Sequence, residues 1–204
     1  MPSTSRGYIN PDISTMNSIA NYILTHLPEL NQELVRVVAA SFETNQYNKG
    51  TILLRQGEVC NHLYFMEEGI CRYYSLKDGN DITTWFSFKN EFVTSFTSFF
   101  PRDPSYENIE VTTPSELHSL SYASLQKLKE QSNEVEKIIN HFIVDYTLQL
   151  ERRLFSIQNH TATEKYTTIL KHDARLVNQI PGKHLASYLG VSRETLSRIR
   201  SSIY

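Results

Sequence analysis

Cysteine is scarce in this sequence, which has only Cys60 and Cys71 among its 204 residues. Two thiols are too few for a disulfide-stapled scaffold, for a zinc site with four cysteine ligands or for an iron–sulfur cluster. A redox pair is the alternative, but the spacing of the two residues does not indicate one. We expect two small, partly buried thiols.

Long apolar runs are also missing. No run approaches the roughly 20 residues that a helix needs to cross a bilayer, and the start, Met-Pro-Ser-Thr-Ser, lacks the basic and then apolar pattern of a signal peptide. Internal repeats and low-complexity segments are absent. Since 40% of the residues are apolar and 11% aromatic, the composition is typical of globular rather than disordered proteins. We expect a soluble, cytoplasmic protein with no membrane partner.

The sequence also lacks a cluster of metal-ligating residues. The seven histidines are scattered along the chain. Metal-binding cupin enzymes need a His-x-His pair and a downstream glutamate, whereas His62 stands alone. We therefore expect no metal, no cofactor and no enzymatic activity. A cupin-like enzyme with a helical tail is the alternative from the enzyme class.

The net charge of −2 hides an uneven distribution of charge. Residues 151–204 contain nine Lys or Arg against four Asp or Glu, a local net charge of +5, whereas residues 1–150 contain eleven against eighteen, a net charge of −7. A polyanionic partner is therefore expected for the C-terminal part only.

The N-terminal part is predicted to be a loose polar tail over residues 1–12, followed by two helices. Apolar positions at helical spacing predict these helices over residues 16–27, where Pro28 ends the run, and over residues 31–42.

The pattern changes between Tyr47 and Ser121 to short runs rich in β-branched and aromatic residues. Glycines separate the runs, and tight hairpin turns favour glycine because they need positive φ. Short strands with regular turn signals predict an antiparallel sandwich or barrel. The predicted strands cover residues 51–55, 62–66, 70–76, 82–88, 109–113 and 116–120.

A long helix is predicted over residues 132–159, because apolar residues advance there by threes and fours. Val144, Leu148 and Phe155 mark a second, smaller apolar face. One face can pack on the barrel, and the other needs a partner, for which a second copy of the chain is the simplest candidate. The alternative is a helix held between two domains of one chain. Another helix is predicted over residues 164–177.

The most informative stretch covers residues 182–200. Gly182 begins a short helix, Gly190 can end it in the left-handed conformation, and Ser192 can cap the next helix with Glu194 in its first turn. Ala186 is small where two helices must approach each other. This pattern predicts a helix-turn-helix whose recognition helix comes last. The alternative is an ordinary helical hairpin with a solvated, charged face.

The second helix carries groups suited to reading bases. Arginine pairs bidentately with guanine, and glutamate accepts from cytosine N4, which suits Arg193, Arg198 and Glu194. Lys183, His184 and Ser192, near helix starts, suit phosphates. The candidate DNA-contacting residues are Lys183, His184, Ser192, Arg193, Glu194, Thr195, Ser197, Arg198 and Arg200.

From about Leu30 to Ile203 the chain resembles the Crp/Fnr family of transcription regulators, named for the cyclic-AMP receptor protein and the fumarate–nitrate regulator. Ser-Arg-Glu-Thr-Leu-Ser-Arg at residues 192–198 is similar to the family's recognition-helix motif. Thr-Ile-Leu-Leu-Arg-Gln-Gly-Glu at residues 51–58, with Leu-Tyr-Phe-Met-Glu-Glu-Gly at residues 63–69, is similar to its opening hairpins.

The resemblance implies an α+β fold with an N-terminal antiparallel β-barrel of the jelly-roll, cyclic-nucleotide-binding type and a C-terminal all-α helix-turn-helix domain. It divides the chain into a sensor (residues 1–131), a dimerisation helix (residues 132–159) and a DNA-binding domain (residues 160–204). The implied partners are double-stranded DNA, a second copy of the chain as homodimer, a small-molecule effector and RNA polymerase.

One departure from the family concerns the effector. Members that bind cyclic nucleotides carry a Gly-Glu pair and an Arg followed by a small residue, whereas Thr94-Ser95 and Ser105-Tyr106 stand near those places. Without these charged anchors, we expect no binding of cyclic AMP. A cyclic-nucleotide-responsive regulator, with Arg102 as the substitute cation, is the alternative. The candidate effector pocket comprises Thr94, Ser95, Thr97, Ser98, Ser105 and Tyr106.

Overall fold

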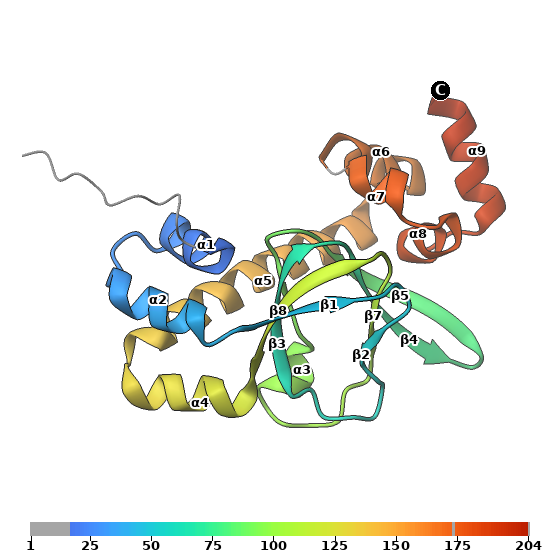
Figure 1. Ribbon diagram of the computed structural model, residues 1–204. Coiled ribbons are helices and arrows are strands. Elements are labelled where there is room, and N and C mark those ends of the chain that lie inside the picture. The colour runs from blue at the N-terminus through green and yellow to red at the C-terminus, as the bar shows by residue number, and fades with distance from the viewer. Residues whose placement is uncertain (1–16, 173, 204) are drawn as a thin grey trace, which may run out of the picture.

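Two four-stranded antiparallel sheets form the centre of the computed structural model, which describes residues 17–172 and 174–203 (Figure 1). The predicted tail over residues 1–12 lies outside these ranges. One sheet has the order β1 (Glu43–Tyr47), β8 (Ser115–Ser121), β3 (His62–Glu68) and β6 (Phe92–Val93). The other has the order β2 (Ile52–Leu54), β7 (Asn108–Val111), β4 (Cys71–Lys77) and β5 (Asn80–Ser87).

The sheets enclose one apolar core. Phe65 of β3, Leu117 of β8 and Val111 of β7 are completely buried in it, and so is the thiol of Cys71. Cys60 is also buried, and neither thiol is in a disulfide. The predicted α+β, jelly-roll-like class is confirmed, but the two sheets form a sandwich and do not close into a barrel.

All six predicted strands are present, and the structure adds two more. β1 was missed because its sequence, Glu-Thr-Asn-Gln-Tyr, has no apolar alternation and its first four residues are exposed. It is nevertheless a strand because its backbone pairs with β8 over five residues. β6 has only two residues, too few to show any period.

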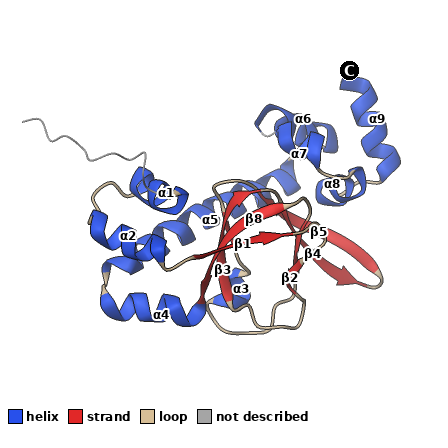
Figure 2. Ribbon diagram, in the orientation of Figure 1, coloured by secondary structure: helices blue, strands red, loops and turns tan. Residues whose placement is uncertain are grey.

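Helices lie at both ends of the sandwich (Figure 2). α1 (Ser18–His26), α2 (Gln32–Ala40) and α4 (Tyr122–Gln131) lie at one end, and α3 (Phe96–Phe99) is a single turn beside the sheets. The predicted first two helices are confirmed, whereas α4 was not predicted. None of the helices within the described ranges combines the length and the apolar character required to cross a membrane.

α5 (Glu134–Asn159) runs along the sandwich and connects its two ends (Figure 1). Val135 and Phe142 of α5 are buried against the sandwich core. Val144, Leu148 and Phe155 are 57%, 43% and 58% exposed, so the predicted second apolar face exists and is uncovered in the single chain.

Four helices follow α5 and form a second core. They are α6 (Ala162–His172), α7 (Ala174–Gln179), α8 (Gly182–Leu189) and α9 (Arg193–Ile203). The helix predicted over residues 164–177 corresponds to α6 and α7, and Asp173 between them lies outside the described residues. Tyr166 and Leu185 are completely buried in this core, where Phe86 and Ile70 of the sandwich also pack.

Candidate functional site

α8 and α9 are joined by the tight turn that the sequence predicts. Gly190 ends α8 in the left-handed conformation (φ 74°, ψ 33°), and its N–H donates to the carbonyls of Ala186 and Ser187. The side chain of Ser192 then caps α9, because its hydroxyl accepts from the N–H of Thr195 at 3.1 Å. These contacts are made within a few residues of chain, so the turn forms from local chemistry.

The two helices bury one face and expose the other. Leu185, Leu189 and Leu196 are at most 3% exposed. Arg193, Glu194, Ser197 and Arg198 are all exposed on α9, and Lys183 is exposed near the start of α8. The predicted base-reading groups therefore lie together on one solvent-facing side of α9.

Glu194 is a hydrogen-bond acceptor on this exposed side of α9. Hydrogen bonds from its own backbone N–H and from the Ser192 hydroxyl lower the pKa of its carboxyl group, and the nearby Arg193 and Arg198 act in the same direction. An ionised Glu194 can accept from a base amino group but not donate to one.

Three of the predicted DNA-contacting residues are only half-exposed in this structure. Arg200 is half-buried and its guanidinium lies 3.5 Å from the carbonyl oxygen of Val177. Thr195 is half-buried, with its hydroxyl 3.2 Å from that of Ser192. His184 is half-buried and contacts Arg72 of the sandwich.

Arg72 of β4 joins the sandwich to α8. Its guanidinium is buried and donates to both carboxylate oxygens of Asp81, at 2.6 and 3.0 Å, and to Glu110 at 2.8 Å. The same group lies 2.8 Å from Nδ1 of His184. Since arginine only donates, His184 must accept through a neutral nitrogen. Burial and the charge of Arg72 lower the pKa of His184 to about 4, so the ring is neutral near pH 7.

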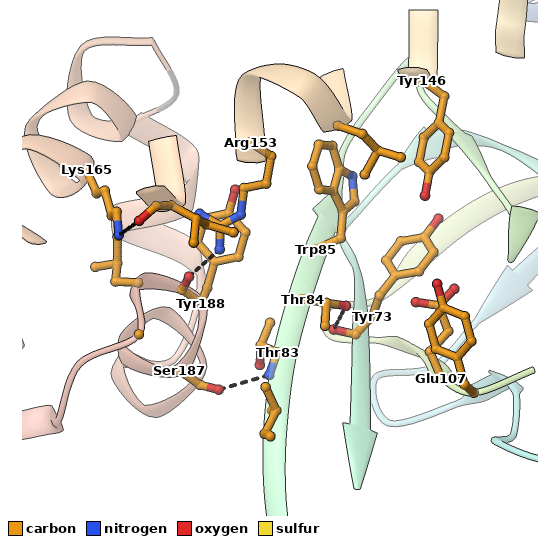
Figure 3. Close-up of a pocket in the computed structure, with 16 residues that line it drawn as sticks. Tyr73, Thr83, Thr84, Trp85, Glu107, Tyr146, Arg153, Lys165, Ser187 and Tyr188 are labelled. Atoms are coloured by element: carbon orange, nitrogen blue, oxygen red, sulfur yellow. Dashed lines mark hydrogen bonds between the residues drawn. The ribbon is translucent and has the colours of Figure 1, made fainter. Parts of the chain in front are cut away.

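A second contact holds α8 on β5, where the N–H of Thr83 donates to the Ser187 hydroxyl at 2.9 Å (Figure 3). The helix-turn-helix therefore has a defined position against the sandwich.

Four of the residues predicted to line an effector pocket, one threonine and three serines, are packed inside the protein. Thr94, Ser95, Ser98 and Ser105 are at most 3% exposed. Ser95 donates to Glu107 at 2.8 Å, and Ser98 accepts from the N–H of Cys60 at 2.8 Å. Their hydroxyls are thus occupied by neighbouring protein groups. Thr97 is exposed.

Arg102 does not supply the missing cation in this region. Its guanidinium donates to the carbonyls of Cys60 and Phe99 and to the side chain of Asn61. It also lies over the ring of Tyr122, 4.1 Å from the centroid. These contacts engage the guanidinium with neighbouring protein groups.

A cavity of about 550 Å³ lies between the sandwich, α5 and the helix-turn-helix (Figure 3). Its lining includes Tyr73 of β4, Trp85 of β5, Arg153 of α5 and Tyr188 of α8. Of the six predicted pocket residues only Tyr106 lines it. The other lining residues were missed because they come from strands and helices far apart in the sequence.

Comparison with known proteins agrees with this architecture. Residues 44–132 match the cyclic nucleotide-binding domain family. No curated protein is significantly similar to the chain in sequence.

Several solved structures share the fold at low sequence identity. FixK2 from Bradyrhizobium japonicum is 19% identical with a TM-score of 0.69, over 79% of this chain and 84% of that one. A Crp/Fnr-family regulator from Eubacterium rectale is 19% identical with a TM-score of 0.68, over 88% and 85%. CLP from Xanthomonas campestris, a global regulator described as responsive to c-di-GMP, is 19% identical with a TM-score of 0.65, over 85% and 91%.

These matches support the fold that the resemblance to the family implies. The region that matches the family contains the strands of both sheets apart from the first residue of β1, and the similar structures extend the likeness over the helices that follow. The chain therefore has the fold of the Crp/Fnr family of transcription regulators, with a region similar to the cyclic nucleotide-binding domain at its centre.

Proposed function

We propose that the protein is a sequence-specific, DNA-binding transcription regulator, not an enzyme, and that it acts as a homodimer. The observation that carries this proposal is the exposed polar side of α9, where Arg193, Glu194 and Arg198 stand opposite a fully buried apolar side. The net charge of +5 over residues 151–204 supports a polyanionic partner.

The exposed groups fall into two roles in this proposal. Arg193, Glu194 and Arg198 read base edges in the major groove, whereas Lys183 and the start of α9 at Ser192 contact phosphates. Ser197 lies on the same side of α9, while His184, Thr195 and Arg200 hold the helices in position. The sensor (residues 1–131) and the DNA-binding domain (residues 160–204) then communicate through residues 132–159, with a small-molecule effector and RNA polymerase as further partners.

The proposed dimer interface is the uncovered side of α5. A symmetric pairing of two α5 helices would bury Val144, Leu148 and Phe155 against their counterparts. Leu148→Glu places an unpaired carboxylate at the centre of that surface, and burying it would cost several kcal/mol. We expect light scattering to show a dimer for the parent protein and a monomer for Leu148→Glu at micromolar concentration.

Leu76→Glu is the matched control, since Leu76 is 56% exposed on β4, away from α5. It should remain dimeric. The dimer should select a two-fold DNA site from a random duplex library, with half-sites roughly 34 Å apart. A parent protein that is monomeric and still selects a palindrome tightly would contradict the proposed dimer.

We also propose that the sensor does not bind cyclic AMP or cyclic GMP. A buried cyclic phosphate carries a full negative charge, and neutral hydroxyls make hydrogen bonds only about half as strong as charged donors. The serines near that position are already hydrogen-bonded, and Arg102 is held elsewhere. Calorimetric titration should detect no binding of either nucleotide, and a micromolar dissociation constant would contradict this.

A further inference from the structure

We infer that the cavity between the sandwich, α5 and α8 binds a small aromatic carboxylate, with its ring beside Trp85 and its carboxylate beside Arg153 and Lys165. This inference rests on the proposed function, because it names the chemical class of the effector.

The cavity has the size and position of a ligand site. Its volume of about 550 Å³ lies within the range of roughly 300–1,000 Å³ that is typical of small-molecule pockets. Val144, Leu148 and Phe155 do not line it, so the proposed dimer interface and the cavity use different sides of α5.

One end of the cavity is aromatic and already ordered. Trp85, Tyr73 and Tyr146 point toward one another there (Figure 3). Tyr146 is fixed by parallel stacking on Phe96, with ring centroids 3.6 Å apart, and Trp85 meets Tyr146 edge-on at 6.5 Å. An aromatic ligand ring can add to such a group at the usual centroid separations of about 4.5–7 Å.

The other end of the cavity is cationic. The guanidinium of Arg153 lies over the ring of Tyr188, 3.7 Å from the centroid, and donates to the Tyr188 carbonyl, while its Nε is buried without a partner. Lys165 donates to the carbonyl of Ile157 at 3.1 Å. Neither cation forms an ion pair within residues 17–172 and 174–203.

Two cations without a described counter-charge favour an anionic ligand. Burial lowers the pKa of Arg153, because removal from water destabilises the charged guanidinium. A ligand carboxylate beside the guanidinium would offset that cost and could accept a hydrogen bond from it. Charge-assisted hydrogen bonds of this kind are roughly twice as strong as neutral ones.

Glu107 favours one orientation of the ligand in the cavity. It lies at the aromatic end, away from Arg153 and Lys165 (Figure 3), and its carboxylate accepts from Ser95. Burial raises the pKa of Glu107, so this end disfavours any further negative charge. The carboxylate of the ligand is therefore directed to the cationic end and its ring to the aromatic end.

The cavity is lined by residues of both the sensor and the proposed DNA-binding domain. Thr83, Thr84 and Trp85 of β5 form one wall, and Ser187 and Tyr188 of α8 form another. A ligand between them would favour one position of α8 over others, which is the requirement for coupling between ligand and DNA binding.

The test uses Trp85, the one tryptophan of the sequence, as the reporter. The full-length protein is titrated with 4-phenylbutyrate and, separately, with its neutral analogue 4-phenylbutanamide, while the emission of Trp85 is recorded. We expect a saturable change with the carboxylate and a dissociation constant at least tenfold higher for the amide. Equal affinities, or no saturable response to the carboxylate, would overturn the inference.

Variants that remove one positive charge from the cavity test where the carboxylate of the ligand binds. Arg153→Gln should abolish the preference for the carboxylate while leaving the weak binding of the amide unchanged. Arg152→Gln is the control, since Arg152 is the exposed neighbour on α5 and does not line the cavity. If Arg153→Gln does not fold, Lys165→Gln replaces it and should reduce the preference. A preference that survives in the folded variant places the carboxylate elsewhere and refutes the site.

Cyclic AMP and cyclic GMP are the competing occupants. If either saturates the Trp85 signal at micromolar concentration, the cavity is a nucleotide site and the inference fails. If the protein binds a two-fold DNA site but does not bind the carboxylate, the inference is refuted and the proposed function is not. Carboxylate binding by a protein that never selects a DNA site would refute the proposed function instead.

Discussion

Replacing Arg198 with alanine is expected to weaken specific DNA binding by about 1–3 kcal/mol, roughly 5- to 150-fold in the dissociation constant. Arg193→Ala should have an effect of the same size. Each arginine is exposed on the polar side of α9 and can donate two hydrogen bonds to one guanine. Removing either one should therefore relax the preference at a single base pair, and removing both should give the largest loss of binding of any surface change.

The measurement is selection from a random duplex library, followed by titration of the selected site and a scrambled one. Lys183→Ala is the matched control, because a phosphate contact contributes equally on every sequence. It should weaken binding to both duplexes alike and lower the slope of log K against log salt by about one. If Arg198→Ala selects the same site as the parent protein with the same stringency, the assignment of α9 as the reading helix is wrong.

Gly69→Ala is expected to destabilise the fold by about 2–5 kcal/mol, combining backbone strain of about 1–2 kcal/mol with overpacking of about 1–3 kcal/mol. Gly69 lies between β3 and β4 with φ at +109°, a region that side-chain-bearing residues avoid. A Cβ built there would lie 1.9 Å from Oγ of Ser115 and 2.9 Å from its Cα. Rotation of the serine side chain cannot relieve the clash with its backbone.

Gly79→Ala separates the two causes. Gly79 lies in the β4–β5 turn with φ at +77°, but a Cβ there would meet nothing within 4 Å. It should therefore incur only the conformational cost, about 1–2 kcal/mol. Urea unfolding of both variants measures the difference. Equal loss of stability in the two would show that the contact with Ser115 is not tight.

The helix-turn-helix could be predicted from the sequence because its signals are local. Gly190 ends α8 through bonds to carbonyls three and four residues back, and Ser192 caps α9 through an N–H three residues on. The inner strands were likewise predictable from β-branched and aromatic runs. β1 was not, since Thr44 and its neighbours are polar and become a strand only through pairing with β8.

The sequence by itself determined the order of elements, the turn between α8 and α9 and the second apolar side of α5. Only the tertiary structure decided where α8 sits and what the cavity contains. Arg72 and His184 are 112 positions apart, and the cavity draws on residues from Tyr73 to Gly190. Local periodicity reports only which side of an element is apolar. Which side chains meet across elements depends on packing, and packing buried the predicted serines while leaving Trp85 and Arg153 around an open volume.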